Sequence, residues 1–261
     1  MITSVQNPKI KLVQDLIRSR KAREESHLFV AEGVRLSEET IRHGRTPEMI
    51  LWSKQLSSRG RDLIAKMINQ DVVVEEISND LMQRISATEF SQGILLVMPA
   101  KPLAIPQKVN LLLALDDLRD PGNLGTILRT AASFGVQGVI LLGNCTDPFA
   151  PKVIRAAMGA HFYLPIMTTT YDEFHNLCQH ILTPQLQITL ADVHGDTPCW
   201  QANLENPLAL VVGGEAEGIS NELIKVADFR VIIPMPGGGE SLNAAIATSI
   251  LLYEITRQRQ K

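Results

Sequence analysis

Four short runs of this 261-residue chain are apolar at every position, and they constrain its fold more than any other feature. They occupy residues 111–115, 139–142, 208–212 and 231–233. A strand with one face in water alternates apolar and polar residues, whereas a strand covered on both faces is apolar throughout. Strands of the covered kind belong to parallel sheets that carry helices on both sides. The second half of the chain is therefore predicted to be an α/β domain with a mostly parallel sheet.

The first hundred residues show a different pattern, in which short apolar strands alternate with amphipathic helices. The clearest helix covers residues 7–20, where apolar residues recur at helical spacing after Asn7 and Pro8. Alternation of this kind predicts a small α/β sandwich. Further strands are expected near residues 28–30, 49–52, 72–74 and 94–98, and helices over 34–43, 63–68, 124–134 and 242–255.

A proline-rich segment separates the two patterns. Three prolines fall within residues 99–106. Proline fixes the φ angle and has no amide proton, so a segment this rich in proline interrupts regular structure. We predict an N-terminal domain over residues 1–99, a linker over 100–107 and a C-terminal domain over 108–261.

The formal net charge of −3 conceals a difference between the two halves. Residues 1–108 hold 16 Lys and Arg against 13 Asp and Glu, whereas residues 109–261 hold 9 against 15. Bulk charge therefore does not hold this chain on nucleic acid, although its N-terminal part is locally basic. Two interpretations of these basic residues stay open, a solvated helix face or a surface that contacts RNA phosphates. The residues are Lys9, Lys11, Arg18, Arg20, Lys21 and Arg23, with Arg35 extending the surface.

The cysteines and histidines narrow the class of protein further. Three cysteines without a CxxC spacing are typical of a protein from a reducing compartment. Charged residues stand where a secretory signal peptide is apolar, and no apolar run reaches the roughly 18 residues of a membrane span. The six histidines show no metal-ligand spacing, and His161 is assigned a structural role. We therefore expect a cytoplasmic protein with no membrane partner and no metal.

Three segments rich in glycine and polar residues follow predicted strands of the second half. They cover residues 116–125, 213–218 and 234–243. Ligands of open α/β sheets bind at the carboxyl ends of strands, so these segments are where a site is expected. None contains GxGxxG or GK[ST], which excludes the usual dinucleotide and nucleoside triphosphate motifs and with them a Rossmann-type dehydrogenase.

The three segments resemble the three motifs of one enzyme family, the SpoU (TrmH) branch of the SPOUT RNA methyltransferases. Residues 120–131 (DPGNLGTILRTA) resemble its motif 1, residues 213–220 (GGEAEGIS) its motif 2, and residues 233–247 its motif 3. The motifs occur in order and at the expected separation. The first hundred residues more loosely resemble the ribosomal-protein-like substrate-binding domain that often precedes this catalytic domain. The resemblance thus implies that residues 1–99 bind the RNA substrate and that residues 108–261 are the SPOUT methyltransferase domain.

This resemblance implies a fold, a reaction and an assembly. The fold is a parallel-sheet α/β domain with a C-terminal trefoil knot. The reaction is transfer of a methyl group from S-adenosyl-L-methionine to a ribose 2′-hydroxyl of structured RNA, and the assembly is a homodimer with the site beside the interface. The N-terminal domain favours large-subunit rRNA as the substrate. A tRNA 2′-O-methyltransferase and a non-catalytic, ribosome-associated RNA-binding protein stay open as alternatives.

Arg129 matches the motif 1 arginine, which the family places at the reacting centre. A guanidinium stays protonated in proteins, so we expect it to hold a phosphate by a fork-like contact and not to act as a free base. Asn123 and Ser241 could instead cap the helices that follow them, and Glu215 could be an exposed surface acid. The catalytic candidates are Asn123, Arg129, Glu215, Ser241 and Asn243.

The resemblance also implies how S-adenosylmethionine is held, largely by backbone atoms around its adenosine part. Glycine permits such a close approach because it has no Cβ. The segment 237–240 is richer in glycine than the family pattern leads us to expect. The cofactor-binding candidates are Gly213, Gly214, Ile233, Met235, Gly237, Gly238 and Leu242.

Overall fold

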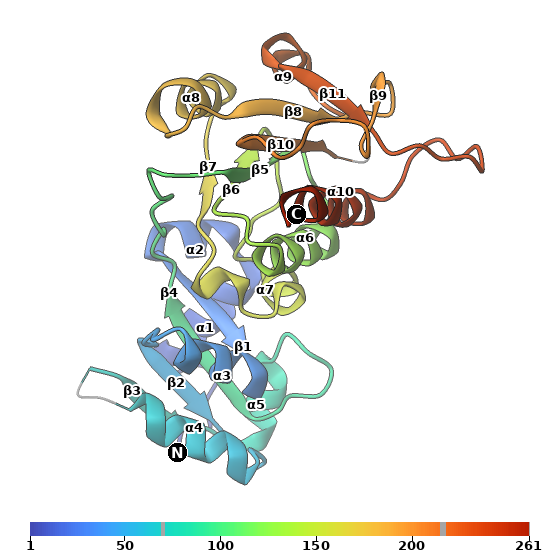
Figure 1. The fold of residues 1–261 in the computed structure, drawn as a ribbon. Helices are drawn as coiled ribbons and strands as arrows, with labels where there is room; N and C mark the ends of the chain where they lie inside the picture. Colours follow the sequence, from blue (N-terminus) through green and yellow to red (C-terminus); the bar gives the residue numbers. More distant parts are fainter. Residues whose placement is uncertain (69–70, 215–217, 261) are drawn as a thin grey trace. The chain divides into compact units, whose positions relative to one another are not determined.

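The structure is a computed structural model that describes residues 1–68, 71–214 and 218–260 (Figure 1). The chain forms two compact units. The first consists of Met1–Lys101 and Asp147–Tyr163, and the second of Pro102–Thr146 and Leu164–Lys261. Residues 147–163, which the sequence assigned to the second domain, thus pack with the first unit. The functional division of the chain at the proline-rich segment stays a prediction.

The second unit contains a seven-stranded sheet in the order β7-β6-β5-β10-β8-β11-β9. Every neighbouring pair of strands is parallel, which confirms the prediction from the apolar runs. All six residues of β5 and all four of β6 are buried. The strands are β5 (Leu111–Asp116), β6 (Val139–Leu142), β7 (Ile166–Thr168), β8 (Gln187–Ala191), β9 (Thr197–Pro198), β10 (Leu208–Gly213) and β11 (Phe229–Ile232).

Helices cover both faces of this sheet. On one face, Phe174 of α8 and Leu223 of α9 pack against Leu112 and Ala114 of β5. On the other face lie α6 and α10, which pack against each other (Figure 1). The helical elements of this unit are α6 (Pro121–Ser133), α8 (Tyr171–Asn176), the π-helical turn η2 (Leu177–Ile181), α9 (Asn221–Val226) and α10 (Ala244–Arg259). Within the described residues, no helix is long and apolar enough to cross a membrane.

The first unit contains a four-stranded sheet in the order β1-β4-β2-β3, flanked by helices. Strand β4 pairs antiparallel with β1 and β2, and β2 pairs parallel with β3. The predicted strands are all present, but α2 and α5 were not predicted, because seven residues are too few to show a clear apolar period. The elements are α1 (Pro8–Arg18), α2 (Arg20–Ser26), β1 (Leu28–Glu32), α3 (Val34–Arg42), β2 (Met49–Trp52), α4 (Ser58–Met67), β3 (Val73–Glu76), α5 (Asn79–Ile85), β4 (Ile94–Pro99), α7 (Pro151–Ala157) and the 3-10 turn η1 (Ala160–Phe162).

An aromatic cluster attaches residues 147–163 to β1. The Phe29 ring lies 5.1 Å from the ring of Phe149 and 6.5 Å from that of Phe162, measured between centroids. The His161 ring packs 5.6 Å from Phe149, and its Nε2 lies 2.7 Å from the Pro148 carbonyl oxygen. Burial lowers the pKa of His161 to about 4, so the ring is neutral near pH 7. These contacts fit the structural role that the sequence assigned to His161.

Arg23 differs from the other residues of the predicted basic surface. Its side chain is 7% exposed and forms an ion pair with Asp147, whose side chain is 12% exposed, at 2.6 Å. Its guanidinium also donates to the carbonyl oxygen of Ile17 at 3.4 Å and to that of Leu16. Arg23 was therefore wrongly placed on the exposed basic surface, since its charge is used to join α2 to residues 147–163.

We expect Arg23→Met to destabilise the first unit by about 3 kcal/mol, because it leaves the Asp147 carboxylate buried without its cation. Lys21→Met removes the same charge from an exposed pair, with Lys21 80% and Glu25 69% exposed, and should cost less than about 1 kcal/mol. Urea unfolding followed by circular dichroism measures both changes. Equal effects of the two substitutions would contradict a buried, structural Arg23.

Candidate active site

The loops that follow β5, β10 and β11 meet at one edge of the second unit's sheet. The strands are parallel and their carboxyl ends lie together, which is where α/β proteins place ligands. A cavity of about 270 Å³ opens there. Its walls include the candidates Gly213, Gly214, Ile233, Met235, Ser241, Leu242 and Asn243, together with residues such as Asp192, Val212 and Leu251.

Four of the predicted site residues lie outside the wall of this cavity, namely Asn123, Arg129, Gly237 and Gly238. Gly237 and Gly238 are exposed, and no heavy atom of the described residues beyond their chain neighbours lies within 4 Å of a Cβ built on either. They belong to the connection between β11 and α10, which projects from the unit (Figure 1). Arg129 is exposed on α6, outside the cavity wall. Glu215 lies outside the described residues.

Gly213 and Gly214 are required by close backbone approaches. A Cβ on Gly213 would lie 2.4 Å from the carbonyl carbon and oxygen of Gly218. A Cβ on Gly214 would lie 2.3 Å from the carbonyl oxygen of Asp117. Any other residue at either position would collide with the main chain, so the loop after β10 can fold against β5 only with glycine there.

Asn123 and Asn243 join motif 1 to motif 3. The Asn243 amide nitrogen donates to Asn123 Oδ1 at 3.1 Å. Asn243 Oδ1 in turn accepts from the backbone nitrogens of Ala245 at 2.9 Å and Ile246 at 3.3 Å, so Asn243 caps α10. Residues 120 positions apart in the sequence therefore meet at the start of two adjacent helices.

The structure replaces both of the capping alternatives that the sequence left open. Asp120, and not Asn123, caps α6, because its Oδ1 accepts from the Asn123 backbone nitrogen at 2.7 Å. Asn243, and not Ser241, caps α10. Asn123 thus stands in the first turn of α6 with its side chain on the neighbouring motif, and Ser241 is an exposed residue of the cavity wall.

Known proteins resemble this chain over its whole length. Residues 110–253 match the SpoU rRNA methylase family, and residues 7–96 match the MRM3-like substrate-binding domain. The chain belongs to the SpoU rRNA methylase family. This membership confirms the resemblance found in the three motifs, while the C-terminal trefoil knot that the family implies stays a prediction.

Three relatives illustrate the match. The chain is 29% identical to the 23S rRNA (guanosine(2553)-2′-O)-methyltransferase RlmP of Bacillus subtilis, covering 97% of this chain and 98% of that protein. It is 31% identical to the 23S rRNA (uridine(2479)-2′-O)-methyltransferase of Streptomyces viridochromogenes, covering 99% and 92%. The AdoMet-bound rRNA methyltransferase from Sinorhizobium meliloti superimposes with a TM-score of 0.88 at 30% identity, covering 100% and 98%.

A buried carboxylate behind the cavity escaped the sequence analysis. Asp116, the last residue of β5, is 1% exposed. Its Oδ2 accepts from the Ser220 backbone nitrogen at 2.7 Å, and its carbonyl oxygen accepts from the Gly214 nitrogen at 2.7 Å. Asp116 thereby holds both ends of the motif 2 loop. In the sequence, Asp116 directly follows the apolar run 111–115. An acid next to buried positions needs hydrogen-bond partners, and this placement could have identified Asp116.

Tyr171 supplies a further hydrogen bond to this carboxylate. Its hydroxyl donates to Asp116 Oδ1 at 2.8 Å. Burial and the bond to Asp116 raise the pKa of Tyr171 to about 12, so the hydroxyl keeps its proton near pH 7. No local pattern indicates this contact, because Tyr171 begins α8, 55 positions beyond Asp116.

Asp192 is a second acid that the sequence analysis did not select. It follows β8 and lies in the cavity wall. Its Oδ1 accepts from the His194 nitrogen at 2.9 Å, and its Oδ2 lies 3.4 Å from Arg230 Nη1. Over the described part of the chain, no three His, Cys, Asp or Glu side chains are grouped so that they could hold a metal ion.

We expect Tyr171→Phe to weaken binding of S-adenosylmethionine, the donor implied by the motifs, by about ten-fold. A lost hydrogen bond to a charged group is worth about 1.5–3 kcal/mol, part of which should loosen the loop that Asp116 holds. Calorimetric titration measures the affinity. Tyr163→Phe, at a 45% exposed tyrosine of the first unit, is the control and should bind as the unaltered protein does. Equal affinities in both variants would show that Tyr171 does not support the loop.

Proposed function

We propose that this chain methylates a ribose 2′-hydroxyl of large-subunit rRNA, with S-adenosylmethionine as the methyl donor. The single observation that carries the proposal is one cavity walled by residues of motif 2 and motif 3, with Asn243 of that wall bonded to Asn123 of motif 1. The substrate is inferred from the relatives named as 23S rRNA 2′-O-methyltransferases, which match this chain across both of its units.

The cavity fits the donor in shape and chemistry. Its volume is near the lower end of the range for small-molecule sites, about 300 Å³, and its walls combine glycine backbone with aliphatic side chains. Gly213 and Gly214 would present main-chain groups, while Ile233, Met235 and Leu242 would pack on the adenosine part. When bound, S-adenosylmethionine supplies an electrophilic methyl group on a sulfonium. Gly237 and Gly238 are left out of the proposed cofactor site because they lie outside the cavity wall.

The exposed Arg129 is proposed to hold the phosphate next to the target ribose. Its guanidinium stays protonated, so its role is to fix the 2′-oxygen in position and not to remove the proton. Asn123 and Asn243 would hold the starts of α6 and α10 in register beside it. Ser241, at the exposed rim, would contact the substrate. Glu215 stays a catalytic hypothesis from the motif alone.

We expect Arg129→Ala to reduce methyl transfer by about a hundred-fold, since a misplaced substrate costs about that much, with S-adenosylmethionine binding changed less than two-fold. Arg129→Lys keeps the charge but not the fork and should recover only part of the activity. Lys225→Ala removes an exposed charge from α9 as a control. The measurement is transfer of labelled methyl to protein-free rRNA from a strain lacking this protein.

The same assay separates the competing functions. Methylation of total tRNA in place of rRNA would favour a tRNA methyltransferase. Binding of rRNA with neither donor binding nor methyl transfer would favour the non-catalytic RNA-binding protein. Unchanged transfer by a folded Arg129→Ala variant would remove Arg129 from the mechanism.

The exposed lysines and arginines of α1 and α2 are proposed to contact RNA phosphates. Lys11, Arg18, Arg20 and Lys21 are exposed, whereas Lys9 is half-buried and forms an ion pair with Glu75. The ion pairs of Arg20 with Glu24 and of Lys21 with Glu25, one turn further along α2, are exposed, and water weakens such pairs. Binding through these residues would make RNA affinity fall as salt rises.

The chain is further proposed to work as a homodimer in the cytoplasm. Ile246, Ile250 and Tyr253 of α10 are 52%, 38% and 59% exposed. Their spacing places them on one face of the helix, next to α6 with Arg129. An apolar helix face of this kind is typical of a protein interface. The three cysteines are buried free thiols, as in proteins of a reducing compartment.

We expect Ile250→Glu to weaken the dimer by about a hundred-fold, because an unpaired carboxylate in an interface costs several kcal/mol. Ile181→Glu, at a 52% exposed isoleucine of η2, is the matched control and should leave the assembly unchanged. Sedimentation velocity over a range of protein concentrations measures the dissociation constant. A monomer in the unaltered protein, or equal behaviour of both variants, would contradict this interface.

A further inference from the structure

The first unit contains a cavity of its own, of about 230 Å³. It lies between the start of α3 and the loop that joins α5 to β4, and α7 closes one side. Its walls include Arg35, Thr88, Phe90, Gln92 and Arg155. Apart from Arg35, none of these residues was selected from the sequence, and the cavity lies outside the proposed active site of the second unit.

Hydrogen bonds fix the loop of residues 86–93 at both ends. At its start, Glu32 accepts from Thr88 Oγ1 at 2.8 Å, from the Ala87 nitrogen at 2.9 Å and from the Ser86 hydroxyl. At its end, Gln92 Oε1 accepts from the Val34 nitrogen at 2.8 Å. The loop is thereby held in one shape before any ligand arrives.

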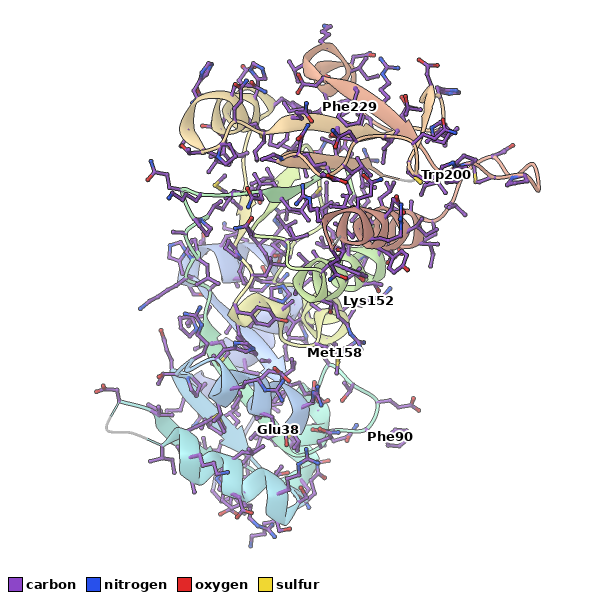
Figure 2. The ribbon with its side chains drawn as sticks, in the orientation of Figure 1. Glu38, Phe90, Lys152, Met158, Trp200 and Phe229 are labelled. Atoms are coloured by element: carbon purple, nitrogen blue, oxygen red, sulfur yellow. The ribbon has the colours of Figure 1, made fainter. Side chains whose placement is uncertain are left out.

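Phe90 projects from this fixed loop into solvent. Its side chain is 81% exposed, the largest exposed fraction among the large apolar residues of the described chain. Its carbonyl oxygen lies 3.3 Å from Thr88 Oγ1, whose proton is donated to Glu32, so the backbone that carries the ring lies close to the fixed start of the loop. Figure 2 shows the ring pointing away from the sheet. A solvent-exposed aromatic ring on a loop fixed by hydrogen bonds offers a flat face on which another ring can stack.

Two arginines provide positive charge beside the ring. Arg155 of α7 donates from Nη1 to the Ala87 carbonyl oxygen at 2.9 Å, which places its guanidinium at the loop. Arg35 is 59% exposed and lies 3.4 Å from Glu39, an acid that also pairs with Arg42 at 3.0 Å. One carboxylate is thus shared by two guanidiniums. Glu32 also lines the cavity and keeps its negative charge, but its oxygens already accept from Ser86, Ala87 and Thr88, so the cations available to an incoming phosphate are Arg35 and Arg155.

We propose that this cavity binds one unpaired nucleotide of the RNA substrate, with its base stacked on Phe90 and its phosphate held by Arg35 and Arg155. An RNA base is flat and carries a phosphate, which matches the ring, the two arginines and the small volume. Thr88 and Gln92 add polar groups to the cavity wall, where they could form hydrogen bonds with the polar edge of the base. Unpaired bases are the part of RNA that proteins stack on aromatic side chains. The proposal rests on the proposed function, in which structured RNA is the substrate.

The test compares Phe90→Leu, which removes the planar ring but keeps an apolar side chain, with Phe90→Tyr, which keeps the ring. The probes are a 12-nucleotide single-stranded RNA of mixed sequence and a fully paired RNA duplex of the same length, titrated against the full chain by fluorescence anisotropy. We expect Phe90→Leu to weaken single-strand binding by about ten-fold, with duplex binding and Phe90→Tyr both changed less than two-fold. With rRNA as the substrate, KM should rise by a similar factor while kcat holds.

Several outcomes would overturn the proposal. Unchanged single-strand binding by Phe90→Leu, or an equal loss on the duplex, would exclude stacking of an unpaired base. A change in sedimentation without a change in RNA binding would assign Phe90 to a protein interface. Failure of the unaltered protein to bind S-adenosylmethionine or methylate rRNA would refute the proposed function, whereas a ten-fold, ring-dependent loss of single-strand binding would still support the cavity.

Discussion

The burial of one parallel sheet on both faces determines where this enzyme can place its chemistry. Strands β5 and β10 are covered by helices on both faces, so their side chains are aliphatic at every position before the last residue of each strand. Polar groups are then restricted to the ends of the strands. Asp116 stands at that boundary, buried at the end of β5 and bonded to the motif 2 loop and to Tyr171. The cavity exists because this carboxylate and the two glycines beside it bring the loops together.

The first unit is stabilised differently, around a small four-stranded sheet. Residues 147–163 pack against its core through an aromatic cluster and through the buried ion pair of Arg23 and Asp147. That segment also brings Arg155 to the loop that carries Phe90. Arg23, which the sequence placed on a basic surface, thus stabilises the fold. The segment that it holds also contains Arg155, which lies at the candidate nucleotide cavity.

Much of the fold could be predicted because it follows from local patterns. The runs at 111–115 and 139–142 became β5 and β6 with bounds within one residue, since burial on both faces leaves an unmistakable apolar signature. The site was harder. Arg23 was misplaced because a charged residue on a helix gives no sign of which side it faces. Gly237 and Gly238 were included because a motif specifies a loop but not which of its residues line a cavity.

The sequence by itself determined four of the seven strands of the parallel sheet, the order of the three motifs and the family to which they belong. These depend on residue type and spacing, which the chain carries locally. Only the tertiary structure decided that Asn123 meets Asn243, that Tyr171 supports Asp116 and that Phe90 stands beside Arg155. Each of these pairs joins residues 55 or more positions apart. Such a contact depends on the folded path of all the residues in between, which no local sequence pattern specifies.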